Sequence, residues 1–178
     1  MDEIIIKEDH FTVFLDEATI QKRVKELSEE LLRAYKGKTP IFIGILNGAF
    51  PFLTDLVKNY NGLCEVEFMK LSSYGDAKIS SGNVKVVKEL EIDISGKDII
   101  IVEDIVDTGL SVKYIERMLE SHNPASVAVV TLLLKPESLK YNVKIDYIGF
   151  SIPSKFVIGY GLDYEQKYRN LKAIYALK

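Results

Sequence analysis

Short apolar segments alternate along this chain with segments whose apolar residues recur at helical spacing. Residues 40–46 (PIFIGIL), 98–102 and 126–134 are almost wholly apolar, and each has the length of one strand. A strand that is apolar on both sides must be covered on both sides, as in a parallel sheet between helices. The alternation therefore predicts an α/β fold with a mainly parallel twisted sheet flanked by helices.

Three segments carry the helical spacing. The first begins at Asp16 and is expected to end near Gly37, the second has Pro51 in its first turn, and the third closes near residues 123–124 (NP). Their apolar residues are Ile20, Val24, Leu27, Leu31 and Ala34 in the first, Phe52, Leu53, Leu56, Val57 and Tyr60 in the second, and Val112, Ile115 and Leu119 in the third. Each helix is expected to bury one face.

The remaining segments are less regular. Residues 65–71 (EVEFMKL) alternate polar and apolar side chains as a strand does, and residues 84–87 resume strand character. Between them, residues 72–83 are polar and rich in serine, which predicts a mobile loop or an irregular hairpin. The tail from Asp146 is aromatic and lacks helical spacing, so we expect short strands and loops folded over the core.

Length, charge and cysteine content limit the class of function. A chain of 178 residues that is 47% hydrophobic fits one globular domain, and a net charge of −3 predicts no nucleic-acid or membrane partner. Cys64 is the only cysteine, which excludes an internal disulfide and a thiolate metal cluster and favours the cytoplasm. The acidic N-terminus is unlike a signal peptide, and no apolar run reaches the ~20 residues that span a membrane.

The apolar run at residues 98–102 leads into a turn suited to phosphate. Residues 99–111 read IIIVEDIVDTGLS, and the turn opens the third helix. Backbone N–H groups at a helix N-terminus bind anions, Gly109 allows close approach, and Thr108 and Ser111 each carry a hydroxyl donor. The turn therefore indicates a phosphate monoester site, although helix capping by Thr108 or Ser111 would explain the same residues.

Acidic residues precede this turn. Glu103 and Asp104 lie at the expected end of the strand, where carboxylates can accept hydrogen bonds from the vicinal hydroxyls of a sugar. Carboxylates also stabilise a developing oxocarbenium-like cation. A phosphorylated sugar satisfies both the acids and the turn; the alternative is an acidic strand end exposed to solvent.

Residues 102–111 (VEDIVDTGLS) resemble the phosphoribosyl-pyrophosphate signature of the type I phosphoribosyltransferases. Further segments resemble the members of that family that use hypoxanthine and guanine, in the same order along most of the chain: residues 46–48 (LNG), 72–74 (SSY), 134–136 (LKP) and 153–169 (PSKFVIGYGLDYEQKYR). The resemblance implies a single domain over residues 1–178. Its core is expected at about residues 36–145, with a small hood from about residues 1–15 and 146–178.

The resemblance also implies a role for each matching residue. The residues expected to bind ribose or phosphoribosyl pyrophosphate are Glu103, Asp104, Asp107, Thr108, Gly109, Leu110 and Ser111, and Asp107 is also the expected catalytic base for the N7 proton of the purine. Pyrophosphate is expected at Leu46, Asn47, Gly48 and Arg169, the purine at Lys135, Phe156, Val157 and Asp163, and a lid at Ser73 and Tyr74. Mg²⁺ is the implied cofactor, with Glu103, Asp104 and Asp163 as ligands.

Several of these residues have a simpler explanation when they are taken alone. A lysine at a strand end is usually solvated, Phe156 and Val157 could be core residues, and Asp163 and Arg169 could be surface charges. One position departs from the pattern, because the family often has lysine where this chain has Asn47. The missing charge raises the hypothesis that pyrophosphate or subunit contacts are weaker here.

The resemblance implies purine salvage by a homodimer or homotetramer. The expected reaction transfers 5-phosphoribosyl from phosphoribosyl pyrophosphate to hypoxanthine or guanine and releases pyrophosphate. One alternative is a phosphoribosyltransferase for xanthine or a pyrimidine. Another is a non-catalytic regulator that senses phosphoribosyl pyrophosphate, against which the net charge of −3 and the absence of room for a DNA-binding module both argue.

Overall fold

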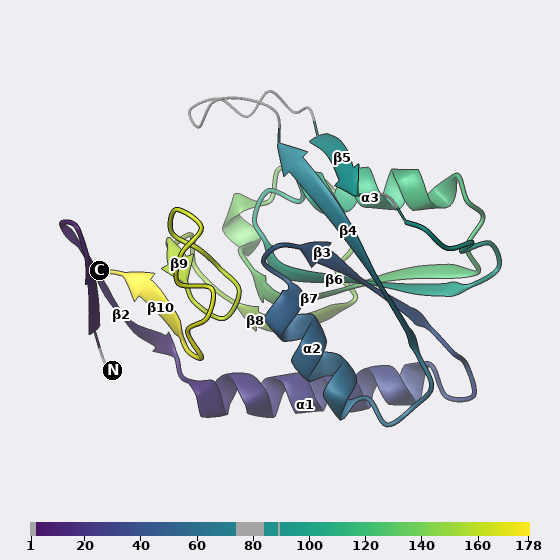
Figure 1. The fold of residues 1–178 in the computed structure, drawn as a ribbon, viewed down its shortest axis with the longest axis horizontal. Helices are drawn as coiled ribbons and strands as arrows, with labels where there is room; N and C mark the ends of the chain where they lie inside the picture. The colour runs from purple at the N-terminus through teal and green to yellow at the C-terminus, as the bar shows by residue number, and fades with distance from the viewer. Residues whose placement is uncertain (1–2, 74–83, 89) are drawn as a thin grey trace.

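The computed structural model describes residues 3–73, 84–88 and 90–178. Six strands form the central sheet in the order β5-β4-β3-β6-β7-β8 (Figure 1). They are β3 (Ile41–Leu46), β4 (Glu65–Ser73), β5 (Val84–Lys88), β6 (Asp98–Val106), β7 (Ser126–Leu134) and β8 (Tyr147–Ser151). All neighbouring pairs are parallel except β4 and β5, which pair antiparallel at one edge. The predicted mainly parallel α/β sheet is confirmed.

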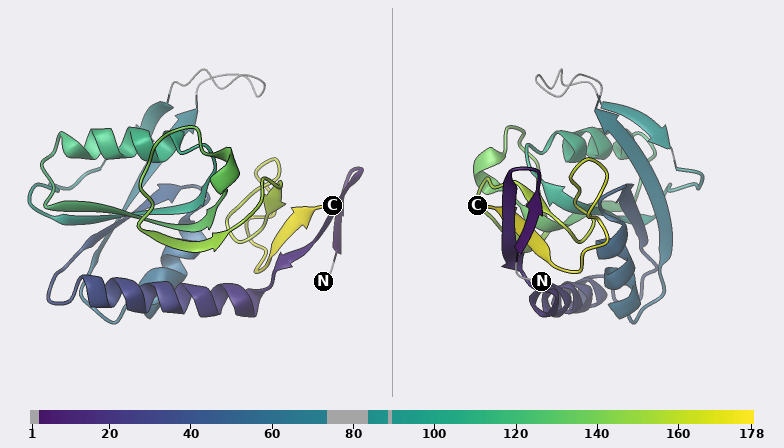
Figure 2. Two further views of the ribbon diagram at one scale, coloured as in Figure 1. Left: turned by 180° about the vertical axis from the view of Figure 1, so that it is seen from behind. Right: turned by 60° about the vertical axis from the view of Figure 1, so that its left-hand side comes forward.

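Helices cover the two faces of this sheet. On one face, α1 (Glu17–Ala34) and α2 (Phe50–Asn59) pack with Phe42 and Ile100 in a single apolar cluster. On the other face, α3 (Leu110–Glu120) packs against Ile43 and Ile101. Figures 1 and 2 show α1 and α2 together on one side of the sheet and α3 on the other. The strict alternation of strand side chains between the two clusters explains why the runs are apolar throughout.

The three helices confirm the spacing argument. The stripe residues Ile20, Val24, Leu27 and Leu31 of α1 are buried, whereas Ala34, the last one expected, is exposed at the end of the helix. Asp16 caps the helix by accepting a hydrogen bond of 2.7 Å from the Thr19 amide. Pro51 stands in the first turn of α2, as expected. Among the described residues, no helix is long and apolar enough to cross a membrane.

A second, antiparallel sheet joins the two ends of the chain. Its order is β1-β2-β10-β9, with β1 (Glu3–Ile6), β2 (Asp9–Leu15), β9 (Val157–Ile158) and β10 (Ile174–Leu177). Strand β2 pairs with both β1 and β10, so the N-terminal hairpin and the C-terminal segment form one unit beside the core (Figure 2). We call this small sheet, together with the segment between β9 and β10, the hood.

The boundary expected between core and hood at residues 145 and 146 is wrong. Strand β8, Tyr147–Ser151, pairs parallel with β7 and is the sixth strand of the central sheet. The sequence did not indicate this strand because Gly149, which has no side chain, interrupts the pattern of apolar residues. A Cβ at Gly149 would lie 2.4 Å from the Leu132 carbonyl oxygen, so the close contact with β7 requires glycine.

Candidate active site

The predicted phosphate turn lies between β6 and α3, at the carboxyl end of the sheet. Gly109 has φ = +84° and is the N-cap residue of α3, and no side chain caps the helix. The Thr108 hydroxyl instead accepts a hydrogen bond of 3.3 Å from the Leu110 amide. A pocket of about 110 Å³ lies in the turn and is lined by Glu103, Ile105, Val106, Asp107, Thr108, Gly109, Leu110, Ser111 and Val112. All five predicted turn residues therefore line one cavity.

Glu103 and Asp104 lie within β6 and not at its end, which corrects the expected strand boundary. Pairing with β3 stops at Val102, whereas pairing with β7 continues to Val106. The Glu103 side chain is buried, and burial raises its pKa well above the ordinary value, with the charge of Asp104 raising it further. Burial also raises the pKa of Asp104 to about 6. No lysine or arginine of the described chain forms an ion pair with either carboxylate.

Gly48 lies directly against the carboxylate of Asp104. A Cβ at residue 48 would be 1.6 Å from Asp104 Oδ2, so any side chain there would require the carboxylate or the loop to move. The peptide between Leu46 and Asn47 is cis. The predicted pyrophosphate loop therefore approaches the acidic pair through its backbone, and glycine at residue 48 permits this close approach.

The C-terminal hood contributes Arg169 and Asp163 beside this loop. Arg169 Nη2 forms an ion pair of 2.7 Å with Asp163 Oδ1, and Nη1 donates a 2.8 Å hydrogen bond to the Gly161 carbonyl. The other Asp163 oxygen accepts a hydrogen bond of 2.8 Å from the Gln166 amide. Both Arg169 and Asp163 act on the pKa of Asp104, the first lowering it and the second raising it. The predicted residues from the two distant segments are therefore neighbours.

Lys135 and Asp107 contact each other across the ends of neighbouring strands. Lys135 follows β7 and Asp107 follows β6, and Lys135 Nζ lies 3.1 Å from Asp107 Oδ2. The Lys135 amide donates a hydrogen bond of 3.0 Å to the Val106 carbonyl, which fixes the lysine backbone to the end of β6. The lysine side chain is 12% exposed and the aspartate 50% exposed, so the carboxylate is open to a ligand.

Phe156 belongs to a group of three aromatic rings. Its centroid lies 6.1 Å from that of Phe11 and 5.9 Å from that of Tyr164, and the Phe11 and Tyr164 rings are themselves 6.1 Å apart. Phe11 is fully buried, whereas Phe156 is 48% exposed. Val157, at the start of β9, has a buried side chain and pairs with Ala176 of β10. One surface of the Phe156 ring is thus available for stacking.

The comparison with known proteins matches this geometry. A family model described as the phosphoribosyl transferase domain matches residues 12–165. The hypoxanthine-guanine phosphoribosyltransferase of Bacillus subtilis is 45% identical over 98% of this chain and 97% of its own length. The enzyme of that name from Lactococcus lactis is 47% identical over 93% of this chain and 90% of its own. The chain belongs to the hypoxanthine-guanine phosphoribosyltransferase family.

A solved structure of the family has the same fold. The hypoxanthine phosphoribosyltransferase of Staphylococcus aureus superposes with a TM-score of 0.89 at 42% identity, over 93% of this chain and 90% of that one. This chain is accordingly a transferase of the phosphoribosyltransferase type.

Two predicted site residues fall at the edge of what the structure describes. Ser73 is the last residue of β4, and Tyr74, predicted with it as part of a lid, lies outside the described residues. Within those residues no three acidic, histidine or cysteine side chains gather into a metal cluster, so Glu103 and Asp104 stand as a pair in this phosphoribosyltransferase.

Sequence reasoning missed three residues that hold the site together. Phe11 and Tyr164 pack against the predicted stacking ring; Phe11 lies in no motif, and Tyr164 lies in the matching segment 153–169 but was given no role. Gly161 has φ = +101°, and a Cβ there would lie 2.0 Å from the Gly48 carbonyl oxygen. It lies in the same matching segment and was likewise given no role. The contact joins the hood of this phosphoribosyltransferase to the loop at residues 46–48.

Proposed function

We propose that this chain transfers the 5-phosphoribosyl group from phosphoribosyl pyrophosphate to hypoxanthine or guanine, giving IMP or GMP and pyrophosphate. The observation that carries the proposal is the 3.1 Å contact between Lys135 and Asp107, beside a phosphate-sized pocket that Asp107 itself lines. A 6-oxopurine presents its O6 acceptor and its N7 on the same edge of the ring system. A lysine and a carboxylate in contact can engage both at once.

The turn at residues 107–111 holds the 5-phosphate in this proposal. Free backbone N–H groups at the start of α3 and the hydroxyls of Thr108 and Ser111 supply the donors. Gly109 lies against Leu139 and Val143, and a Cβ there would be 3.0 Å from Val143 Cγ2. The turn is therefore held in place by the segment after η1 (Pro136–Ser138), so its donors are oriented before the ligand arrives.

Asp107 is the general base in this proposal, and Lys135 reads the purine. As N9 of the purine attacks the anomeric carbon and pyrophosphate departs, Asp107 takes or shares the N7 proton. The Lys135 ammonium donates to the 6-oxo group and leaves the amino group of adenine without an acceptor. Phe156 stacks on the ring, and the Val157 backbone binds its edge.

Glu103 and Asp104 suit a hard divalent cation. Burial raises the pKa of both carboxyl groups, and no cationic side chain of the described residues neutralises them in an ion pair. Two carboxylates suffice for Mg²⁺, which retains several waters and takes further oxygens from substrate. Mg²⁺ bound there would neutralise the charge of the pyrophosphate leaving group. Asp163 is the proposed ligand on the pyrophosphate side, where it has to share its carboxylate with Arg169.

The loop at residues 46–48 binds pyrophosphate through its backbone in this proposal, with Arg169 beside it. Asn47 supplies no charge there. An Asn47→Lys variant should bind pyrophosphate more tightly or assemble more stably. Unchanged pyrophosphate affinity together with unchanged assembly would contradict this role for Asn47.

A homodimer or homotetramer in the cytoplasm is the proposed working form. Its support is a set of exposed apolar side chains on α2, on β4 and just before β4, namely Phe50 at 44%, Leu63 at 78% and Val66 at 43% exposure. Sedimentation of the purified chain would test the assembly. A monomer at micromolar concentration would contradict it.

A panel of bases tests the proposed reaction. The purified chain is mixed with phosphoribosyl pyrophosphate, Mg²⁺ and hypoxanthine, guanine, xanthine, adenine or uracil, and the nucleotide is measured. Hypoxanthine or guanine should give the highest kcat/KM. A preference for xanthine or uracil would change the proposed purine substrate but support phosphoribosyl transfer. The absence of product with every base would contradict the proposed enzymatic activity.

A further inference from the structure

A second pocket lies on the other side of the phosphate turn. It has a volume of about 400 Å³ and is lined by Leu110, Lys113, Tyr114, Arg117, Tyr141 and Asn142. Four of these residues belong to α3, and the other two belong to the segment between η1 and β8. This volume falls within the range of small-molecule sites. Of the residues assigned above to the proposed active site, Leu110 also lines this pocket.

The lining combines two cations with two aromatic rings and contains no carboxylate. Lys113 and Arg117 are four residues apart on α3 and therefore lie on the same face of the helix. Arg117 is exposed and forms no ion pair or hydrogen bond within the described part of the chain. Lys113 has one contact, at 4.0 Å, with Glu116. Two cations that are largely unneutralised, next to Tyr114 and Tyr141, suit a ligand that has both a phosphate and a planar ring.

Leu110 lines both this pocket and the phosphate pocket, so the two cavities share one wall. The segment that carries Tyr141 is also bonded to the turn. The amides of Lys140 and Tyr141 both donate to the Thr108 carbonyl, at 3.0 and 3.2 Å. A ligand that moves Tyr141 or Leu110 must therefore act on the turn that is proposed to hold the 5-phosphate.

We propose that this second pocket is an effector site for a nucleoside monophosphate, distinct from the active site and coupled to the phosphate turn. The phosphate pairs with Lys113 and Arg117, and the base stacks on a tyrosine ring. Only the coupling rests on the proposed function, since binding to the pocket requires no catalysis. By linkage, the effector and the active-site nucleotide must change each other's affinity by the same factor.

The test measures binding while the active site is filled. The chain is saturated with phosphoribosyl pyrophosphate and Mg²⁺, which fill the proposed active site without supplying a nucleoside monophosphate, and binding of radiolabelled AMP is followed by equilibrium dialysis. AMP is the probe because its 6-amino group is a poor match for Lys135 in the active site. We expect one AMP site on the loaded wild type, and we expect Arg117→Ala to weaken AMP binding by roughly tenfold or more, as expected for the loss of a charge-assisted hydrogen bond.

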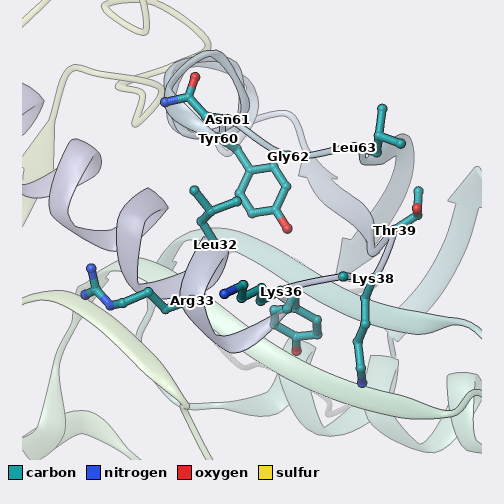
Figure 3. Close-up of a pocket in the computed structure, with 11 residues that line it drawn as sticks. Leu32, Arg33, Lys36, Lys38, Thr39, Tyr60, Asn61, Gly62 and Leu63 are labelled. Atoms are coloured by element: carbon teal, nitrogen blue, oxygen red, sulfur yellow. The ribbon is translucent and has the colours of Figure 1, made fainter.

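Arg33 provides a matched control. It also lies in the last turn of a helix, as Arg117 does, but in α1, on the other face of the sheet. There it lines a pocket of about 580 Å³ near the amino ends of β3 and β4, with Tyr60 and Lys36 (Figure 3). Arg33→Ala should leave AMP binding unchanged.

Three results would overturn the proposal. They are the absence of AMP binding to the loaded wild type at millimolar concentration, equal binding by wild type and Arg117→Ala, and AMP binding only in competition with phosphoribosyl pyrophosphate. Loss of nucleotide synthesis in the base panel would reject the proposed reaction instead, so the two failures are distinguishable. The coupling is tested separately, by measuring whether AMP changes the affinity of the wild type for phosphoribosyl pyrophosphate but not that of Arg117→Ala.

Discussion

Lys135 Nζ lies 3.1 Å from Asp107 Oδ2, so the residue proposed to read the purine is paired with the residue proposed to take its proton. The pair is formed between the ends of β7 and β6, which are adjacent parallel strands. A purine that binds here must enter between the two side chains or beside both. The ion pair therefore holds the proposed catalytic base, Asp107, and the proposed purine-selecting residue, Lys135, in position before the purine binds.

Replacement of the proposed catalytic base, Asp107, should lower kcat more than it changes the KM for the substrates. Asp107→Asn keeps the size of the side chain but cannot accept the N7 proton, so kcat should fall about 10²- to 10⁴-fold, as is typical for general-base catalysis. Steady-state kinetics with hypoxanthine measure the change. A variant with more than half of the wild-type kcat would exclude Asp107 as the base.

Lys135→Ala should alter the choice of base. The loss of a hydrogen bond from a charged donor to the 6-oxo group corresponds to roughly a ten- to hundredfold lower kcat/KM for hypoxanthine. The kcat/KM for adenine should remain at its low value, and the KM for phosphoribosyl pyrophosphate should change little. Lys140→Ala, whose backbone bond to Thr108 is retained, is the control. Equal losses with hypoxanthine and adenine would show that Lys135 does not read the 6-position.

Gly48→Ala should abolish activity because its Cβ would collide with the carboxylate of Asp104, 1.6 Å away. The loop or the carboxylate must move, and either movement disrupts the pyrophosphate side of the site. Gly37→Ala is a useful comparison, since a Cβ at residue 37 meets no atom within 4 Å but has an unfavourable φ of +78°. That variant should lose about 1 kcal/mol of stability and keep its kcat. A fully active Gly48→Ala enzyme would contradict the role assigned to the glycine.

Asp104→Asn should stabilise the protein at neutral pH in the absence of divalent cations. Burial raises the pKa of Asp104 from 3.8 to about 6, so the folded protein binds a proton more readily than the unfolded chain. The stability contributed by the protonated group is present at acidic pH and is lost as the pH rises through 6. Urea unfolding near pH 7 should give the variant an advantage of roughly 1 to 2 kcal/mol.

The same comparison with Mg²⁺ and phosphoribosyl pyrophosphate present checks the proposed cation site. Ligand binding should stabilise the wild type more than the variant and reduce or reverse the difference. An equal increase in stability for both proteins would argue against Asp104 as a ligand.

Phe11→Leu should raise the KM for the purine without changing the KM for phosphoribosyl pyrophosphate. The Phe11 ring lies 6.1 Å from that of Phe156, and such ring contacts contribute about 0.5 to 1.5 kcal/mol each. Phe42→Leu is the control, because Phe42 is equally buried and pairs with Tyr60 at 5.2 Å, in β3 of the central sheet. It should destabilise the protein to a similar extent and leave both KM values unchanged. If Phe11→Leu changed the KM for the purine and the KM for phosphoribosyl pyrophosphate by the same factor, Phe11 would have only a structural role.

The central sheet and its helices were predictable because their apolar residues repeat. The stripe at Ile20, Val24, Leu27 and Leu31 is buried as the spacing requires, and residues 126–134 form β7 as expected. Short strands were expected in the tail, but the place of β8 in the central sheet was missed because its side chains are only partly buried and Gly149 interrupts them. The extension of β6 through Glu103 and Asp104 was also missed, because a strand end inferred from hydrophobicity stops at the first charge.

The residues around the site were accessible to sequence reasoning only where a local motif carried them. Residues 103–111 are contiguous, so their order indicated a phosphate turn followed by a helix. The contacts of Phe11 with Phe156 and of Gly161 with Gly48 join segments more than a hundred residues apart. The local sequence of either segment does not indicate which distant residue it contacts. Such contacts are decided by the packing of the hood on the core, which the sequence pattern does not encode.

The pairing of β2 with β10 also orders the assembly of the site during synthesis on a ribosome. The phosphate turn is supported by residues up to Val143, so that half can form before residues 174–177 have been made. The ring group proposed to stack on the purine belongs to a hood in which β2 has no second partner strand until Ile174–Leu177 is made. A nascent chain would therefore acquire its anion-binding half before its base-selecting half.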